Sequence, residues 1–120
     1  MDYDVELRFQ AVKEKLESTF GEGMDVQAIL FLIGVNELGT GYKEFSKSEK
    51  TDLLHVAICT ILLPHGFYEF KGRDEEDWPH FDLIKELPQL NDREQQHLIK
   101  EAIIGYFKEN GYFDLNTPSS

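Results

Sequence analysis

The segment 45–64, FSKSEKTDLLHVAICTILLP, constrains the fold more than any other, because a helix start signal precedes a long apolar run. Ser46 is a good N-cap, and Glu49 can reach back to the Ser46 N–H and complete a capping box. Nearly every residue from 53 to 63 is apolar, which indicates a helix that is covered on all sides. Pro64 provides a sharp stop. We therefore predict a buried central helix in this segment.

Two helices are predicted before it. The apolar residues of the segment 2–20 recur at helical spacing and leave the charged residues on the other side, as in a surface helix with one buried face. Asp25 is a suitable cap for a second helix over 26–38, whose middle is apolar all round. Gly34 would allow this second helix to approach another backbone closely. We expect the second helix to lie against the central one.

A last helix is predicted from the second capping-box pattern, Asn91 with Glu94, to about residue 110. Ile104 falls on its charged side, so we expect this side chain to be exposed. The predicted buried face consists of Ile99, Ala102, Ile103 and Tyr106.

The segment 64–90 has two short runs of weakly alternating apolar and polar residues, FYEF and HFDLI, on either side of a polar loop. This pattern favours a β-hairpin or an irregular extended ribbon. The alternative is a helical turn followed by an acidic loop and a short helix that begins near Pro79. The fold class that follows is mainly α: a compact bundle of four principal helices, with a short irregular or β-hairpin segment between helices 3 and 4. Residues 1–115 are predicted to form a single helical domain and residues 116–120 a flexible tail.

Charge and cysteine content narrow the functional classes. The formal net charge of -11 and the isoelectric point near 4.7 disfavour nucleic acid or an anionic membrane as a partner. The central helix is also too short to span a bilayer. Cys59 is the only cysteine, so an internal disulfide is impossible. The N-terminal residues lack the basic start and apolar core of a signal peptide, which favours a cytoplasmic location.

Metal binding is one hypothesis for the central helix. Asp52, His55 and Cys59 stack on one helical face, and each residue type can ligate a metal or transfer protons. Glu37, near the end of the second helix, would complete a divalent-metal set of His55, Asp52 and Glu37. The ordinary interpretation is favoured: a solvated aspartate, a histidine that is satisfied locally, and a cysteine that acts as a small hydrophobe.

A ligand pocket between the central helix and the loop 65–81 is a second hypothesis. Trp78 lies beside His80 at a loop end, where a tryptophan either lines a pocket or fills part of the core. The predicted lining residues are His55, His65, Trp78, His80 and Glu37.

Two functional classes remain. We favour a non-catalytic, small acidic helical protein that acts through protein–protein interaction, either with a second copy of itself or with another protein. No cofactor is expected in this case. The alternative is a small metal- or ligand-binding enzyme, which requires the candidate residues to converge on one cavity.

Overall fold

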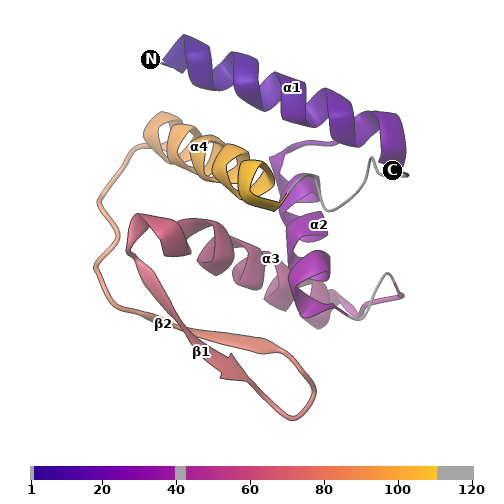
Figure 1. The fold of residues 1–120 in the computed structure, drawn as a ribbon, viewed down its shortest axis with the longest axis vertical. Helices are drawn as coiled ribbons and strands as arrows, with labels where there is room; N and C mark the ends of the chain where they lie inside the picture. The colour runs from indigo at the N-terminus through magenta and orange to yellow at the C-terminus, as the bar shows by residue number, and fades with distance from the viewer. Residues whose placement is uncertain (1, 40–42, 111–120) are drawn as a thin grey trace. The chain divides into compact units, whose positions relative to one another are not determined.

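The computed structural model describes residues 2–39 and 43–110, and this part of the chain is mainly α-helical (Figure 1). Its helices are α1 (Asp2–Phe20), α2 (Val26–Leu38), α3 (Lys47–Leu62) and α4 (Asp92–Asn110). A short 3₁₀ helix, η1 (Leu63–His65), follows α3 directly. The strands β1 (Tyr68–Arg73) and β2 (Pro79–Leu83) then form a two-stranded antiparallel sheet. The predicted mainly α fold with a hairpin between the third and fourth helices is confirmed.

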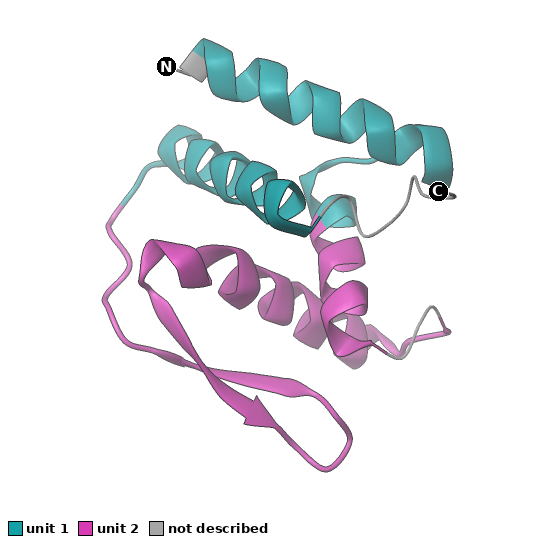
Figure 2. Cartoon of the chain, in the orientation of Figure 1, with its two compact units in different colours: residues 1–29, 90–120 teal, residues 30–89 magenta. Residues whose placement is uncertain are grey.

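The chain divides into two compact units (Figure 2). Met1–Ile29 and Leu90–Ser120 form unit 1, and Leu30–Gln89 form unit 2, so α2 begins in one unit and ends in the other. The single domain over 1–115 therefore stays a prediction. The predicted tail at 116–120 lies outside the described residues.

The helix starts follow the predicted caps. The Ser46 side chain accepts from the Glu49 N–H at 3.1 Å, and the Glu49 carboxylate accepts from the Ser46 N–H at 2.9 Å. Asn91 and Glu94 form the same reciprocal pair at the start of α4. The Asp25 carboxylate accepts from the Ala28 N–H at 2.9 Å and caps α2. Each cap satisfies a backbone donor that the helix itself leaves unpaired.

In unit 1, α1 and α4 pack side by side (Figure 2). Lys100 of α4 links them, because its ammonium group lies 3.0 Å from the Glu6 carboxylate and 5.2 Å from the centre of the Phe9 ring. Ile104 is half-buried, so the prediction that it is exposed was wrong. Phe20 at the end of α1 is exposed. The buried side chains of these two helices are Phe9, Val12, Leu16, Ala102, Ile103, Tyr106 and Phe107.

In unit 2, α2 approaches α3 closely at Gly34, as the sequence predicted. A β-carbon added at Gly34 would overlap the backbone carbonyl of Leu53. The prediction that α3 is covered on all sides was wrong in part, because Leu54 and Ile58 are only half-buried. An outer strip of α3 that includes Asp52 remains exposed. The buried face of α3 consists of Leu53, Val56, Ala57, Cys59, Ile61 and Leu62.

Candidate interaction surface

The hairpin of unit 2 has a definite register, which decides which side chains share a face. Tyr68 pairs with Leu83, Glu69 with Asp82, and Phe70 with Phe81. Since side chains alternate along a strand, one face of the hairpin is apolar and the other is charged. The apolar face carries Tyr68, Phe70, Phe81 and Leu83, and the charged face carries Glu69, Asp82 and His80.

A β-bulge interrupts β1 after Phe70, because Gly72 pairs with His80 and leaves Lys71 as an extra residue. Gly72 has a φ of +114°, a conformation that L side chains rarely adopt. The Lys71 ammonium group lies 3.6 Å from the Asp82 carboxylate, which places Lys71 on the charged face of the hairpin.

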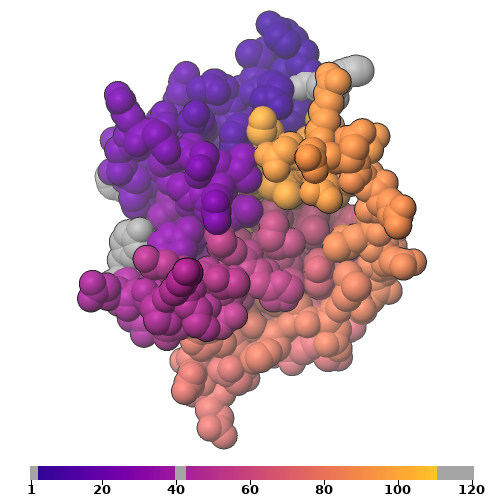
Figure 3. Space-filling model, turned by 180° about the vertical axis from the view of Figure 1, so that it is seen from behind, coloured from indigo at the N-terminus to yellow at the C-terminus, as the bar shows by residue number. Residues whose placement is uncertain are grey.

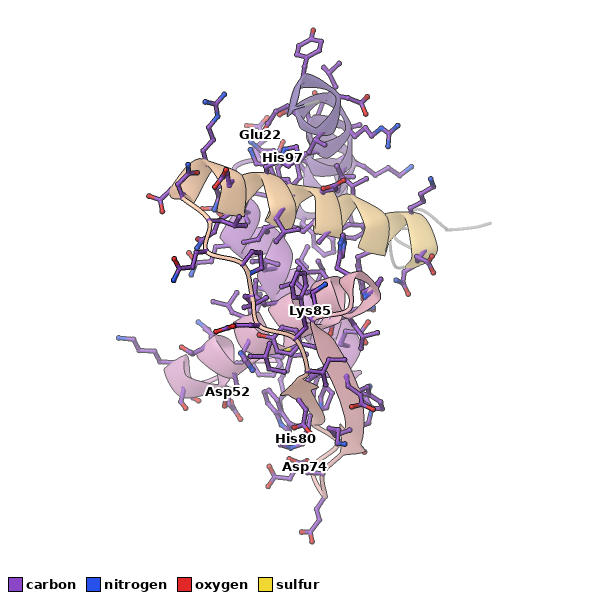
Figure 4. All side chains as sticks on the ribbon, turned by 90° about the vertical axis from the view of Figure 1, so that its left-hand side faces the viewer. Glu22, Asp52, Asp74, His80, Lys85 and His97 are labelled. Carbon is purple, nitrogen blue, oxygen red and sulfur yellow. The ribbon has the colours of Figure 1, made fainter. Side chains whose placement is uncertain are left out.

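The loop between the strands is organised by Asp74. Its carboxylate accepts from the backbone N–H groups of Glu76 at 2.9 Å and Trp78 at 3.0 Å. The same carboxylate lies 2.9 Å from the His80 ring nitrogen (Figure 4). The His80 contact and these backbone bonds hold the pKa of Asp74 below its usual value. The loop projects at the foot of the space-filling view (Figure 3). The Asp74 carboxylate therefore stabilises the turn itself.

Arg73 fastens the hairpin to the end of α2. Its guanidinium group donates to the carbonyl oxygens of Glu37 at 2.7 Å and Leu38 at 3.3 Å. It also donates to the Asp77 carbonyl at 2.8 Å, within its own loop. A helix leaves its last carbonyls unpaired, and a cation at that end also complements the helix dipole. Arg73 therefore caps α2 from a distant part of the sequence.

Trp78 reinforces this attachment. It packs against a buried cluster formed by Val35, Leu38, Phe45 and Leu53. Of the two roles foreseen for this tryptophan, packing on the core is the one that the contacts describe.

At the opposite end of the hairpin, Tyr68 meets α3. It forms a hydrogen bond with the Cys59 thiol, and the Cys59 sulfur lies 3.5 Å from the Nε2 atom of His55. Burial raises the pKa of Cys59 to about 11, although the Tyr68 hydrogen bond acts in the opposite direction. Burial and the neighbouring Cys59 also raise the pKa of Tyr68. The Cys59 thiol is thus held neutral and is a poor nucleophile.

This environment leads to a prediction about the reactivity of Cys59. In the folded protein, modification by a thiol reagent is expected to be at least tenfold slower at pH 8 than in denaturant, because little thiolate forms. Since the folded pKa is raised from 9.0 to about 11, the contribution of the neutral thiol to stability is complete below pH 9 and is lost as the pH rises towards 11. Stopped-flow labelling and urea unfolding between these pH values measure both effects. Equal labelling rates in the folded and unfolded states would contradict the prediction.

The remaining candidate residues lie in different parts of unit 2. Asp52 and His55 are exposed on α3, and His65 is exposed in η1. His80 contacts Asp74 in the hairpin (Figure 4). Within residues 2–39 and 43–110, no three histidine, cysteine, aspartate or glutamate side chains gather closely enough to hold a metal ion. The set His55, Asp52 and Glu37 is not assembled.

A hollow of about 480 Å³ lies at the start of α4 and is lined by Asn91, Arg93, Glu94 and His97. Two of these side chains, Asn91 and Glu94, are already engaged in the capping box of the helix. The Glu94 carboxylate also opposes the binding of an anion there.

The exposed apolar side chains are concentrated around the hairpin. Of the eight large hydrophobic residues that are exposed in the described part of the chain, five lie between residues 63 and 87. The exposed fractions are 49% for Phe70, 54% for Leu83 and 57% for Ile84. These three residues, with the charged Glu69, Lys71 and Asp82, are called the hairpin surface below. None of the six was predicted from the sequence, although five of them lie in the alternating runs FYEF and HFDLI.

No protein-family model, curated protein or solved structure matches the chain. No helix among the described residues is long and apolar enough to cross a membrane.

Proposed function

We propose that the chain is a non-catalytic, cytoplasmic interaction domain that binds a protein partner through the hairpin surface. The observation that carries the proposal is that Phe70 and Leu83, each about half exposed, share the apolar face of one short hairpin, with the exposed Ile84 directly after β2. Exposed apolar side chains are ordinary when they are scattered, but their concentration at one place is typical of a binding surface.

The attachment of the hairpin supports this proposal. Arg73 and Trp78 tie its loop end to α2 and the buried cluster, and Tyr68 ties its other end to Cys59 of α3. A surface that is held at both ends loses little conformational entropy when it binds. A two-stranded sheet also has free edges, and peptide and protein partners commonly bind by adding a strand to such an edge.

The environments of Cys59 and of two predicted pocket residues, His80 and Trp78, favour the same class. Cys59 is buried with a raised pKa, and the His80 ring is engaged by Asp74 within the turn. Trp78 packs on the core cluster. Each of these groups therefore has a local structural role. A catalytic site would require them to converge on one substrate position.

Site-specific photocrosslinking in the cells that make the protein tests the proposal. A photoreactive phenylalanine analogue replaces Phe70 in one variant and Phe20 of α1 in the matched control. The two rings are similarly exposed, at 49% and 43%. We expect a covalent adduct of defined mass, either a second copy of the chain or another protein, at position 70 and not at position 20. The same adducts at both positions, or none at position 70, would contradict the proposed function.

A further inference from the structure

We propose that the partner is a second copy of this chain, which pairs with the first through the free edge of β1. The two β1 strands would run antiparallel about a two-fold axis at Phe70 and extend each hairpin into a shared four-stranded sheet. This inference rests on the proposed function, because it names the partner of the same hairpin surface.

The backbone of β1 presents suitable groups to such a partner. The Ile84 N–H donates to the Phe67 carbonyl at 2.9 Å, which makes these two residues a hydrogen-bonded pair of the antiparallel ladder. Hydrogen-bonded and non-hydrogen-bonded pairs alternate along the ladder. The backbones of Glu69 and Asp82 therefore form a hydrogen-bonded pair, and those of Phe70 and Phe81 form a non-hydrogen-bonded pair. The N–H and C=O groups of Phe70 therefore point away from β2, towards the free edge.

On the charged face of the hairpin, Glu69 and Asp82 are two carboxylates beside one lysine, Lys71. Glu69 lies directly across from Asp82, and two like charges in this position destabilise a strand pair. Lys71 forms an ion pair with Asp82. Glu69 forms no ion pair or side-chain hydrogen bond within the described residues. Among the residues that the structure describes, one carboxylate of the pair therefore has no cation beside it.

A second copy supplies that cation. In antiparallel pairing centred on Phe70, Glu69 of one chain lies opposite Lys71 of the other, and the two-fold axis repeats the pair. Positions 69 and 71 form a non-hydrogen-bonded pair in this register, the kind in which opposite side chains approach most closely. The short sequence Glu69–Phe70–Lys71 is thus complementary to itself in charge.

The apolar face gains from the same arrangement. The half-exposed Phe70 ring, already in edge-to-face contact with Phe81 at 5.7 Å, would lie beside the Phe70 ring of the second copy. The bulge after Phe70 limits the regular edge to a few residues. The interface is therefore small, and we expect a weak dimer.

The edge of β2 is less suitable for the same contact. Pro79 has no N–H to donate, and pairing about Phe81 would place Asp82 opposite His80 of the second copy. At the β1 edge the facing cation is a lysine, a residue type that carries a full positive charge at neutral pH, which histidine ordinarily does not. The charge pattern therefore favours β1.

Charge reversal tests the pairing directly. Glu69→Lys places lysines at positions 69 and 71, so two copies of this variant repel each other. Lys71→Glu places glutamates at both positions, and two copies of that variant also repel each other. A 1:1 mixture of these two variants restores opposite charges at every facing pair. Sedimentation velocity is run on the native chain, on each variant and on the mixture, over about three orders of magnitude in concentration. We expect each single variant to dimerise about tenfold more weakly than the native chain, and the mixture to associate at least as well as the native chain.

The matched control reverses two exposed charges of α4, with Lys108→Glu and Glu109→Lys. These variants have the same net charges as the hairpin variants, and their mixture is expected to associate no better than either one alone. A native chain that stays monomeric, with no association in the mixture of the hairpin variants, would overturn the inference. If photocrosslinking at position 70 then captured only other proteins, the proposed function would stand without the second copy. If it captured nothing, both would fail.

Discussion

Replacement of Gly34 by alanine is expected to destabilise the protein by about 3 kcal/mol, because the new methyl group has no space. A β-carbon at this position would overlap the Leu53 carbonyl, a backbone group of the neighbouring helix α3. A flexible side chain could move aside, but Leu53 is completely buried and its backbone is part of a helix. The methyl group is accommodated only if α2 and α3 separate, and that would loosen the cluster of Val35, Leu38, Phe45 and Leu53.

Gly105→Ala in α4 is the matched control, because Gly105 also lies within a helix. A β-carbon at Gly105 meets no atom within 4 Å. Alanine is the better helix former, so this variant is expected to gain about 0.5–1 kcal/mol. Urea unfolding followed by circular dichroism measures both variants. The expected result is a lower midpoint for Gly34→Ala and a higher one for Gly105→Ala, with similar slopes. Equal midpoints would show that α2 and α3 are not in close contact at Gly34.

The helices were predictable because their boundary signals are local. Ser46 with Glu49 and Asn91 with Glu94 each act within one turn of the chain, and both pairs form reciprocal caps in the structure. The close approach at Gly34 was also predictable, because few other reasons place a glycine within an apolar helix. Here the local sequence and the packing of the folded chain favour the same structure.

The exposure of α3 was harder to predict. Apolar residues around the whole helix indicated complete burial, but Leu54 and Ile58 are half-buried. The hydrophobic pattern of one helix shows which side chains can be buried. It does not show how much surface the neighbouring elements supply. The same reason accounts for Ile104, which is half-buried although it falls on the charged side of α4.

The candidate interaction surface depended on long-range contacts. The alternation in FYEF and HFDLI favoured a hairpin, but it did not show that Phe70 and Leu83 would remain half exposed. The hydrogen bond between Tyr68 and Cys59 likewise joins a strand to a helix, and no residue spacing specifies it. The sequence instead indicated Trp78 and His80 as pocket residues, because tryptophan and histidine often line ligand sites. Both have structural roles at the loop end of the hairpin.

The replacement of Arg73 by alanine is expected to have the second-largest effect, a loss of about 2 kcal/mol in the stability of the hairpin. Three carbonyl oxygens, of Glu37, Leu38 and Asp77, would lose a charged donor together. Lysine is expected to restore only part of the loss, because its single ammonium group does not have the planar, forked donors of the guanidinium group. The defect is expected to be local, since the described contacts of Arg73 join the hairpin loop to the end of α2.

Native-state hydrogen exchange measures this prediction, because it resolves the opening of one element from global unfolding. In Arg73→Ala, the backbone amides of β1 and β2 are expected to exchange about 30-fold faster, which corresponds to the loss of about 2 kcal/mol. The amides of α4 are expected to keep their rates. Arg93→Ala is the matched control: Arg93 is exposed in the first turn of α4, where its positive charge opposes the helix dipole. This control is expected to leave hairpin exchange unchanged. If Arg73→Ala did the same, the attachment of the hairpin would depend on Trp78 and Tyr68 rather than on Arg73.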